Sequence, residues 1–218
     1  MKVSLFLLPP FLVAAQERPL GTGARLFDPR YSGNGCPQGS ANLTISDTGE
    51  WVTVNYSKFR TYIGPSYSPL QKVRNCQVQL RIIAPISQDR PSPQGVQGVQ
   101  FAIAGSEYEG YYSQLDEGIT AIHHSTYYSN DLDTYTVSTI ARFDGGEMWK
   151  APGRSYNDSR EIPRSSQAYT YCTRPGANMS VFNANERIAM NSSNPEGFGI
   201  SFAGEAEELI YTRRIKLS

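Results

Sequence analysis

Acidic residues interleaved with tyrosines make residues 107–117 the stretch whose side chains could do chemistry. Glu107 and Glu109 have the same parity in a β-strand, which would put both carboxylates on one face about 7 Å apart. Glycoside hydrolysis uses two carboxylates about 5–9 Å apart, and Asp116 is a further candidate. The competing interpretation is a solvated acidic edge whose interleaved tyrosines pack inward.

The tyrosines themselves suggest a second kind of site. Tyrosine has an apolar face and a polar tip, so exposed rings can stack on sugars. The candidates for such a surface are Tyr108, Tyr111, Tyr127, Tyr128 and Tyr135. The alternation of a strand instead predicts that half of these rings belong to the core.

Metal and cofactor chemistry is not favoured by the remaining residues. The two histidines, His123 and His124, are adjacent, so in a strand they point to opposite faces and cannot chelate one metal ion. No C-x-x-C spacing and no G-x-S-x-G elbow occur. Residues 130–133 offer oxygen ligands but lack the pattern of an EF-hand, and a plain turn is the better interpretation. We therefore expect no metal and no cofactor.

The first fifteen residues predict export. A basic start, a short apolar core and Ala14-Ala15 before a polar stretch are typical of a signal peptide cleaved after Ala15. The apolar run is shorter than the roughly 20 residues that span a bilayer. The expected organisation is a signal peptide over 1–15, a flexible lead-in over 16–35 and a single domain over 36–218, in a protein that acts outside the cell.

Composition and periodicity predict an all-β fold. The 20 basic and 20 acidic residues balance, which does not favour a nucleic-acid partner, and no second long apolar segment indicates a membrane span. Many tyrosines, glycines and prolines punctuate alternating segments, beginning with a hairpin of 41–46 and 52–57. Further strands are expected near 78–82, 99–104, 119–128, 134–143, 168–173, 179–190, 197–203 and 208–215. The whole predicts an antiparallel two-sheet β-sandwich with long loops, among them a mobile excursion over 144–166.

Five N-glycosylation sequons and three cysteines add to the picture of an exported protein. The sequon asparagines are Asn42, Asn55, Asn157, Asn178 and Asn191. Asn42 and Asn55 both fall on the polar faces of the first hairpin, where a glycan is tolerated. The cysteines are Cys36, Cys76 and Cys172, which leave one thiol over and allow three alternative bridges.

An ordered set of motifs resembles a family of secreted domains of unknown function, the one numbered four-three-six-zero. The motifs are Gly33-Asn34-Gly35-Cys36-Pro37-Gln38-Gly39, Arg74-Asn75-Cys76-Gln77, Tyr108-Glu109-Gly110-Tyr111 and Ser125-Thr126-Tyr127-Tyr128. The resemblance covers about residues 33–145 well and implies a secreted, disulfide-bearing domain with no established activity.

Two departures from the family pattern bear on charge and on the cysteines. Glu109 stands where the family usually has arginine, and Ile215 stands where a fourth cysteine commonly closes the last strand. On this resemblance the expected bridge is Cys76–Cys172, with Cys36 unpaired.

The function predicted from these features is non-catalytic. We expect an extracellular binding or interaction module, with cell-wall or surface glycans as partners. The alternatives are a secreted polysaccharide hydrolase that uses Glu107, Glu109 or Asp116, and a structural wall-associated protein. The oligomeric state and the ligand are left open by the sequence.

Overall fold

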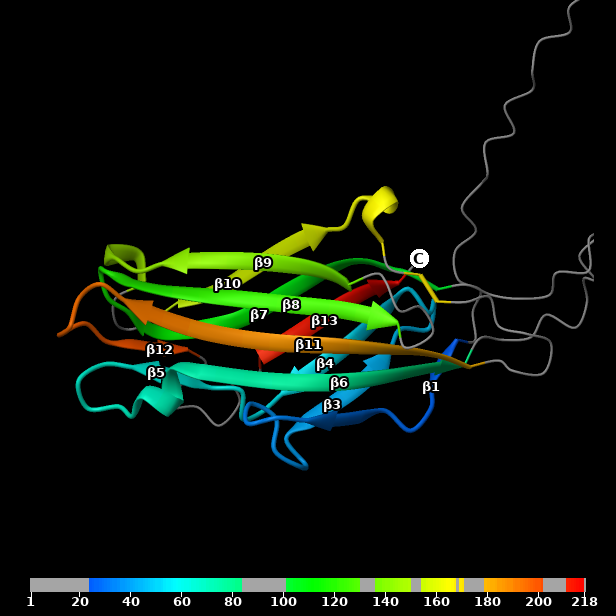
Figure 1. Cartoon of the computed structure of the whole chain (residues 1–218), viewed down its shortest axis with the longest axis horizontal. Helices are drawn as coiled ribbons and strands as arrows, with labels where there is room; N and C mark the ends of the chain where they lie inside the picture. The colour runs from blue at the N-terminus through cyan, green and yellow to red at the C-terminus, as the bar shows by residue number, and fades with distance from the viewer. Residues whose placement is uncertain are drawn as a thin grey trace, which may run out of the picture.

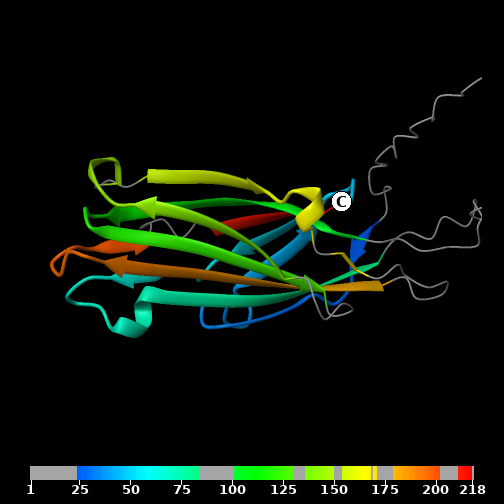
Figure 2. The ribbon, with the colours of Figure 1, turned by 45° about the horizontal axis from the view of Figure 1, so that its top comes forward.

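Two antiparallel sheets stacked face to face make up the protein in the computed structural model (Figure 1). The structure describes residues 24–83, 101–129, 136–149, 154–167, 169–170, 179–201 and 211–217. Within these ranges every element is a β-strand or a short 3-10 helix, and the two layers separate clearly in the tilted view of Figure 2. The predicted all-β sandwich is confirmed.

Six strands form sheet A. They are β1 (Arg25–Leu26), β2 (Arg30–Ser32), β6 (Val73–Ile83), β8 (Ile119–Ser129), β9 (Thr136–Asp144) and β11 (Met179–Ser192). Their order is β1-β6-β11-β8-β9, with β2 also on β6. The long central strand β11 pairs with β6 on one side and β8 on the other.

Seven strands form sheet B. They are β3 (Ala41–Ile45), β4 (Trp51–Tyr56), β5 (Thr61–Ile63), β7 (Ile103–Leu115), β10 (Arg154–Glu161), β12 (Gly199–Ser201) and β13 (Tyr211–Leu217). The order is β3-β4-β13-β7-β12-β5, and β10 lies on β7. The 3-10 turns are η1 (Pro69–Lys72), η2 (Glu147–Trp149) and η3 (Arg164–Ser166).

Alternating residues of the two sheets fill the space between them. In β8 every odd-numbered residue from Ile119 to Ser129 is buried and every even-numbered one is half-buried. In β4 the same alternation buries Val52, Val54 and Tyr56. This period of two is the pattern of a strand with one face on a core and the other toward solvent.

The sheets extend beyond the segments expected from the sequence. The lead-in expected over 16–35 contains β1 and β2, which both pair with β6. The mobile excursion expected over 144–166 is wrong, because residues 154–161 form β10 along eight positions of β7. Tyr156 secures β10, since its ring is buried and stacks on Tyr112 with centroids 4.9 Å apart. The residues 1–23, which hold the predicted signal peptide, lie outside the described part of the chain.

The disulfide joins Cys36 to Cys76, so the expected Cys76–Cys172 bridge is wrong. The chain after β2 continues beside β6, where Gly35 N donates to Asn75 O at 2.9 Å. This path brings the Cα atoms of Cys36 and Cys76 to 5.5 Å, within the range that a disulfide requires. Cys172 lies outside the described residues. The helices of the described chain include none long and apolar enough to cross a membrane.

Candidate functional site

The outer face of sheet A carries a tyrosine ring that lies across the neighbouring strand. Tyr128 belongs to β8, and its hydroxyl accepts a hydrogen bond of 3.1 Å from Nε2 of Gln77 on β6. Strand β11 lies between these two strands. Two strand spacings are about 9.5 Å, so Tyr128 reaches Gln77 only by extending over β11. The ring therefore lies along the sheet rather than standing away from it.

The residue beneath this ring supports the same orientation. Asn183 of β11 is paired directly with Tyr128 and has the parity of the solvent face, yet it is only 3 % exposed. A side chain at an outward position is buried only when a neighbour covers it, and Tyr128 is the ring opposite. Tyr128 itself is half-buried, so part of this residue is exposed to solvent.

Amide and hydroxyl side chains surround Tyr128 in two rows across the sheet. One row is Ser138, Thr126, Asn185, Gln77 and Ser32, and the other is Thr136, Tyr128, Asn183, Gln79 and Arg30. Among these ten residues only Arg30 is charged. We call these two rows the Tyr128 face.

The other predicted stacking tyrosines do not join this face. Tyr108 and Tyr127 are fully buried in the core, so the prediction that they bind a ligand surface is wrong. Tyr111 is half-buried on the outer side of sheet B, on the opposite side of the sandwich from Tyr128. Tyr135 lies outside the described residues. Of the predicted tyrosines that the structure describes, Tyr128 alone therefore lies on the outer face of sheet A.

The predicted carboxylates divide between two places. Glu107 and Glu109 share the outer face of sheet B, as their parity predicts. Glu107 pairs with Arg214 at 2.7 Å, and Arg214 also lies over the ring of Trp51, 4.5 Å from its centroid. Asp116 lies beyond the far end of β7, where its Oδ2 accepts from Phe198 N at 2.8 Å. Asp116 is therefore about 20 Å or more along the strand from Glu109.

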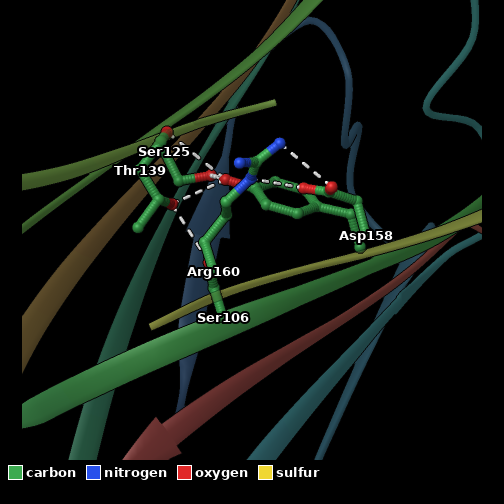
Figure 3. Close-up of polar contacts among 6 residues, drawn as sticks. Ser106, Ser125, Thr139, Asp158 and Arg160 are labelled. Carbon is green, nitrogen blue, oxygen red and sulfur yellow. Dashed lines mark hydrogen bonds and ion pairs between the residues drawn. The ribbon is translucent and has the colours of Figure 1, made fainter. Parts of the chain in front are cut away.

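A buried polar network that was not predicted from the sequence lies between the sheets, and Figure 3 shows the part of it around Ser106, Ser125 and Thr139. Ser125 Oγ donates to Glu186 Oε2 at 2.5 Å and accepts from the hydroxyl of Tyr108 at 3.0 Å. Tyr108 also contacts Oγ1 of Thr139 at 2.6 Å, and Thr139 contacts Ser106 at 3.0 Å. The sequence contains one signal for this network, because Glu186 occupies a core position between Ala184 and Ile188 in an alternating strand.

Aromatic and charged groups close this network on the side of β10. The hydroxyl of Tyr112 lies 2.7 Å from Nε2 of His123, and burial raises the pKa of Tyr112 well above its usual value. Burial also raises the pKa of Tyr156, with smaller contributions from the charges of neighbours, Glu186 among them. Figure 3 shows the Asp158–Arg160 pair of β10 beside the hydroxyls. Charged side chains on the inward parity of an outermost strand oppose pairing with another sheet.

The network has the composition of an acid–base site but is closed to a reactant. Ser125 is 1 % exposed, Glu186 is 2 % exposed and His123 is fully buried. Buried polar groups that bond to one another stabilise and specify a core. His124 is half-buried on the opposite face of β8, as expected for adjacent residues of a strand.

Comparison with known proteins places the chain in a family. A family model described as a domain of unknown function, DUF4360, matches residues 24–215. The chain belongs to the DUF4360 family. This confirms the resemblance stated from the motifs, and the DUF4360 match extends it over nearly the whole described chain.

Individual matches of this DUF4360 chain are distant. An uncharacterized secreted protein of Arthroderma benhamiae is 25 % identical over 172 residues, which are 78 % of this chain and 60 % of that relative. The chain thus spans less than two thirds of the relative's length. A solved structure of infectious bursal disease virus Gx strain matches at 11 % identity and a TM-score of 0.27, over 99 % of this chain and 41 % of that one. A similarity of that size supports no argument about fold or function.

Proposed function

We propose that the protein is a secreted, non-catalytic module that binds neutral polysaccharide through the Tyr128 face. One observation carries the proposal: the Tyr128 ring extends over β11 to Gln77 and offers its outer side to solvent among amides and hydroxyls. An aromatic ring on a flat surface can stack on the apolar face of a sugar ring. The hydrogen bond to Gln77 fixes the ring before the ligand arrives, which lowers the entropy that binding must overcome.

The neighbours of Tyr128 define the ligand class. Amide and hydroxyl groups both donate and accept hydrogen bonds, as sugar hydroxyls do. Nine of the ten residues in the two rows are uncharged, which favours a neutral chain over a strongly acidic one. The rows cross five strands and extend about 19 Å, a span of several sugar units.

The setting of this activity is outside the cell. The predicted signal peptide and the secreted relative support an extracellular location. The Cys36–Cys76 disulfide is of the kind that persists in oxidising compartments. A cell-wall or surface polysaccharide is the partner that fits this location.

A pull-down of the mature chain with insoluble neutral polysaccharides tests the proposal. We expect Tyr128→Ala to weaken binding by about tenfold, the effect of roughly 1.4 kcal/mol. Tyr111→Ala is the matched control, since that ring lies on the other side of the sandwich and its loss should leave binding unchanged. Equal binding by the Tyr128 variant and the parent would contradict the proposal.

The same preparations distinguish binding from hydrolysis. If the parent protein released soluble sugar from the polysaccharide and Glu107→Gln abolished that release, the protein would be a hydrolase instead. We expect no release by the parent protein. The Arg214 partner of Glu107 supports this expectation, because the ion pair gives that carboxylate a structural role on the sheet surface.

A further inference from the structure

Three of the sequon asparagines lie in one row across sheet B. The register places Asn42 opposite Asn55, Asn55 opposite Thr212, Thr212 opposite Glu109 and Glu109 opposite Asn157. The row therefore crosses β3, β4, β13, β7 and β10 in turn. Sequence spacing alone gives no hint of this arrangement, since Asn157 is about a hundred residues from Asn55.

The two ends of this row differ from its interior. Within the described chain β3 and β10 are the outermost strands of sheet B at this level. Asn42 and Asn157 are both exposed there, and each has a paired neighbour on one side only. Asn55 is half-buried and is flanked on both sides, by Asn42 and by Thr212.

These positions leave different amounts of room for a glycan. Directly opposed residues in an antiparallel pair have Cβ atoms about 5 Å apart, which is less than two branched glycans need side by side. Four strand spacings separate Asn42 from Asn157, about 19 Å, so these two sites do not interfere. A glycan on Asn42 can lean outward over the sheet edge, whereas one on Asn55 would stand between occupied neighbours.

We propose that Asn42 and Asn157 carry N-linked glycans that cover β3 and β10, the outermost strands of this row among the described residues, and that Asn55 between them is unmodified. The glycans then stand on both sides of Glu109. An uncovered strand edge is a template for pairing with another sheet, and a bulky hydrophilic group on the outermost strand blocks that approach. The modification would keep sheet B from associating and leave the opposite side, with the Tyr128 face, as the side open to a ligand.

Peptide mapping of the full chain secreted from a eukaryotic host tests the occupancy. Trypsin releases Asn42 and Asn55 together in peptide 31–58, and Asn157 in peptide 155–160. Enzymatic deglycosylation in heavy-oxygen water marks each formerly modified asparagine. We expect the mark at Asn42 and Asn157 and its absence at Asn55. A mark at Asn55 as frequent as at Asn42, or no mark at Asn157, would overturn the assignment.

Removal of the glycans from the folded, secreted protein tests the edge-covering role. We expect light scattering to show association after removal, and the same for Asn42→Gln/Asn157→Gln. Asn191→Gln is the matched control, because Asn191 is an exposed sequon on sheet A, opposite Thr120 of β8, and its loss leaves β3 and β10 of sheet B unchanged. If light scattering shows that the protein without glycans does not associate, the edge-covering role is overturned. Polysaccharide pull-down of the same samples separates this result from the binding proposal, because Tyr128 lies on the other side of the sandwich.

Discussion

Replacing Ser125 by alanine removes the central hydroxyl of the buried network. That hydroxyl donates to Glu186 at 2.5 Å and accepts from Tyr108 at 3.0 Å. A hydrogen bond to a charged group contributes about 1.5–3 kcal/mol and a neutral one about 0.5–1.5 kcal/mol. The expected loss in the free energy of unfolding is therefore about 3 kcal/mol, since the carboxylate of Glu186 stays in the core and loses a donor.

Urea denaturation of Ser125→Ala beside the parent measures this loss. For a chain of this size, 3 kcal/mol corresponds to a fall in Tm of about 6–12 °C. Ser138→Ala on the exposed side of β9 is the matched control, with an expected change below about 0.5 kcal/mol. A loss for Ser125→Ala as small as that of the control would refute the claim that the network holds a desolvated carboxylate.

Two further predictions concern the disulfide and alkaline pH. Cys36→Ser should lower the free energy of unfolding by about 4 kcal/mol, because the bridge closes a loop with a sequence separation of 40. Cys172→Ser should leave the Cys36–Cys76 linkage intact in a non-reducing peptide map. The pKa values of Tyr112 and Tyr156 are raised by burial, so their contribution to stability is complete below the ordinary tyrosine pKa and is lost as the pH rises above it. The urea midpoint of unfolding should therefore fall as the pH rises above about 10. Tyr156→Phe should make this fall with pH less steep. A urea midpoint that rises with pH above about 10 would contradict the prediction.

Alternation predicted the strands whose two faces differ. The hairpin of β3 and β4 and the long strands β6 and β8 are present where the period of two placed them. Strand β10 was missed because it is an outermost strand with charges on its inward parity, so Asp158 and Arg160 hide the apolar position of Tyr156. Its partner β7 is distant in sequence, and no local pattern indicates that pairing.

The candidate site was only partly predictable for a similar reason. Parity separates Tyr127 from Tyr128, but both faces of β8 carry apolar and polar residues, so parity does not say which ring faces solvent. The packing of sheet B on the odd-numbered face of β8 decides this, as the contacts of Ser125 with Tyr108 and of His123 with Tyr112 show. The Cys36–Cys76 bridge also depends on non-local packing, because it requires β2 to lie along the edge of β6.

The place of β13 in sheet B has a consequence for the order in which that sheet can form. Strand β13 fits between β4 and β7, which come much earlier in the sequence and do not pair with each other at this level. The two parts of sheet B can therefore join only after residues 211–217 have been made, which is later than every other strand of the sheet. A deletion of residues 211–217 would remove the strand that joins β4 to β7 and so divide this layer into two separate ribbons.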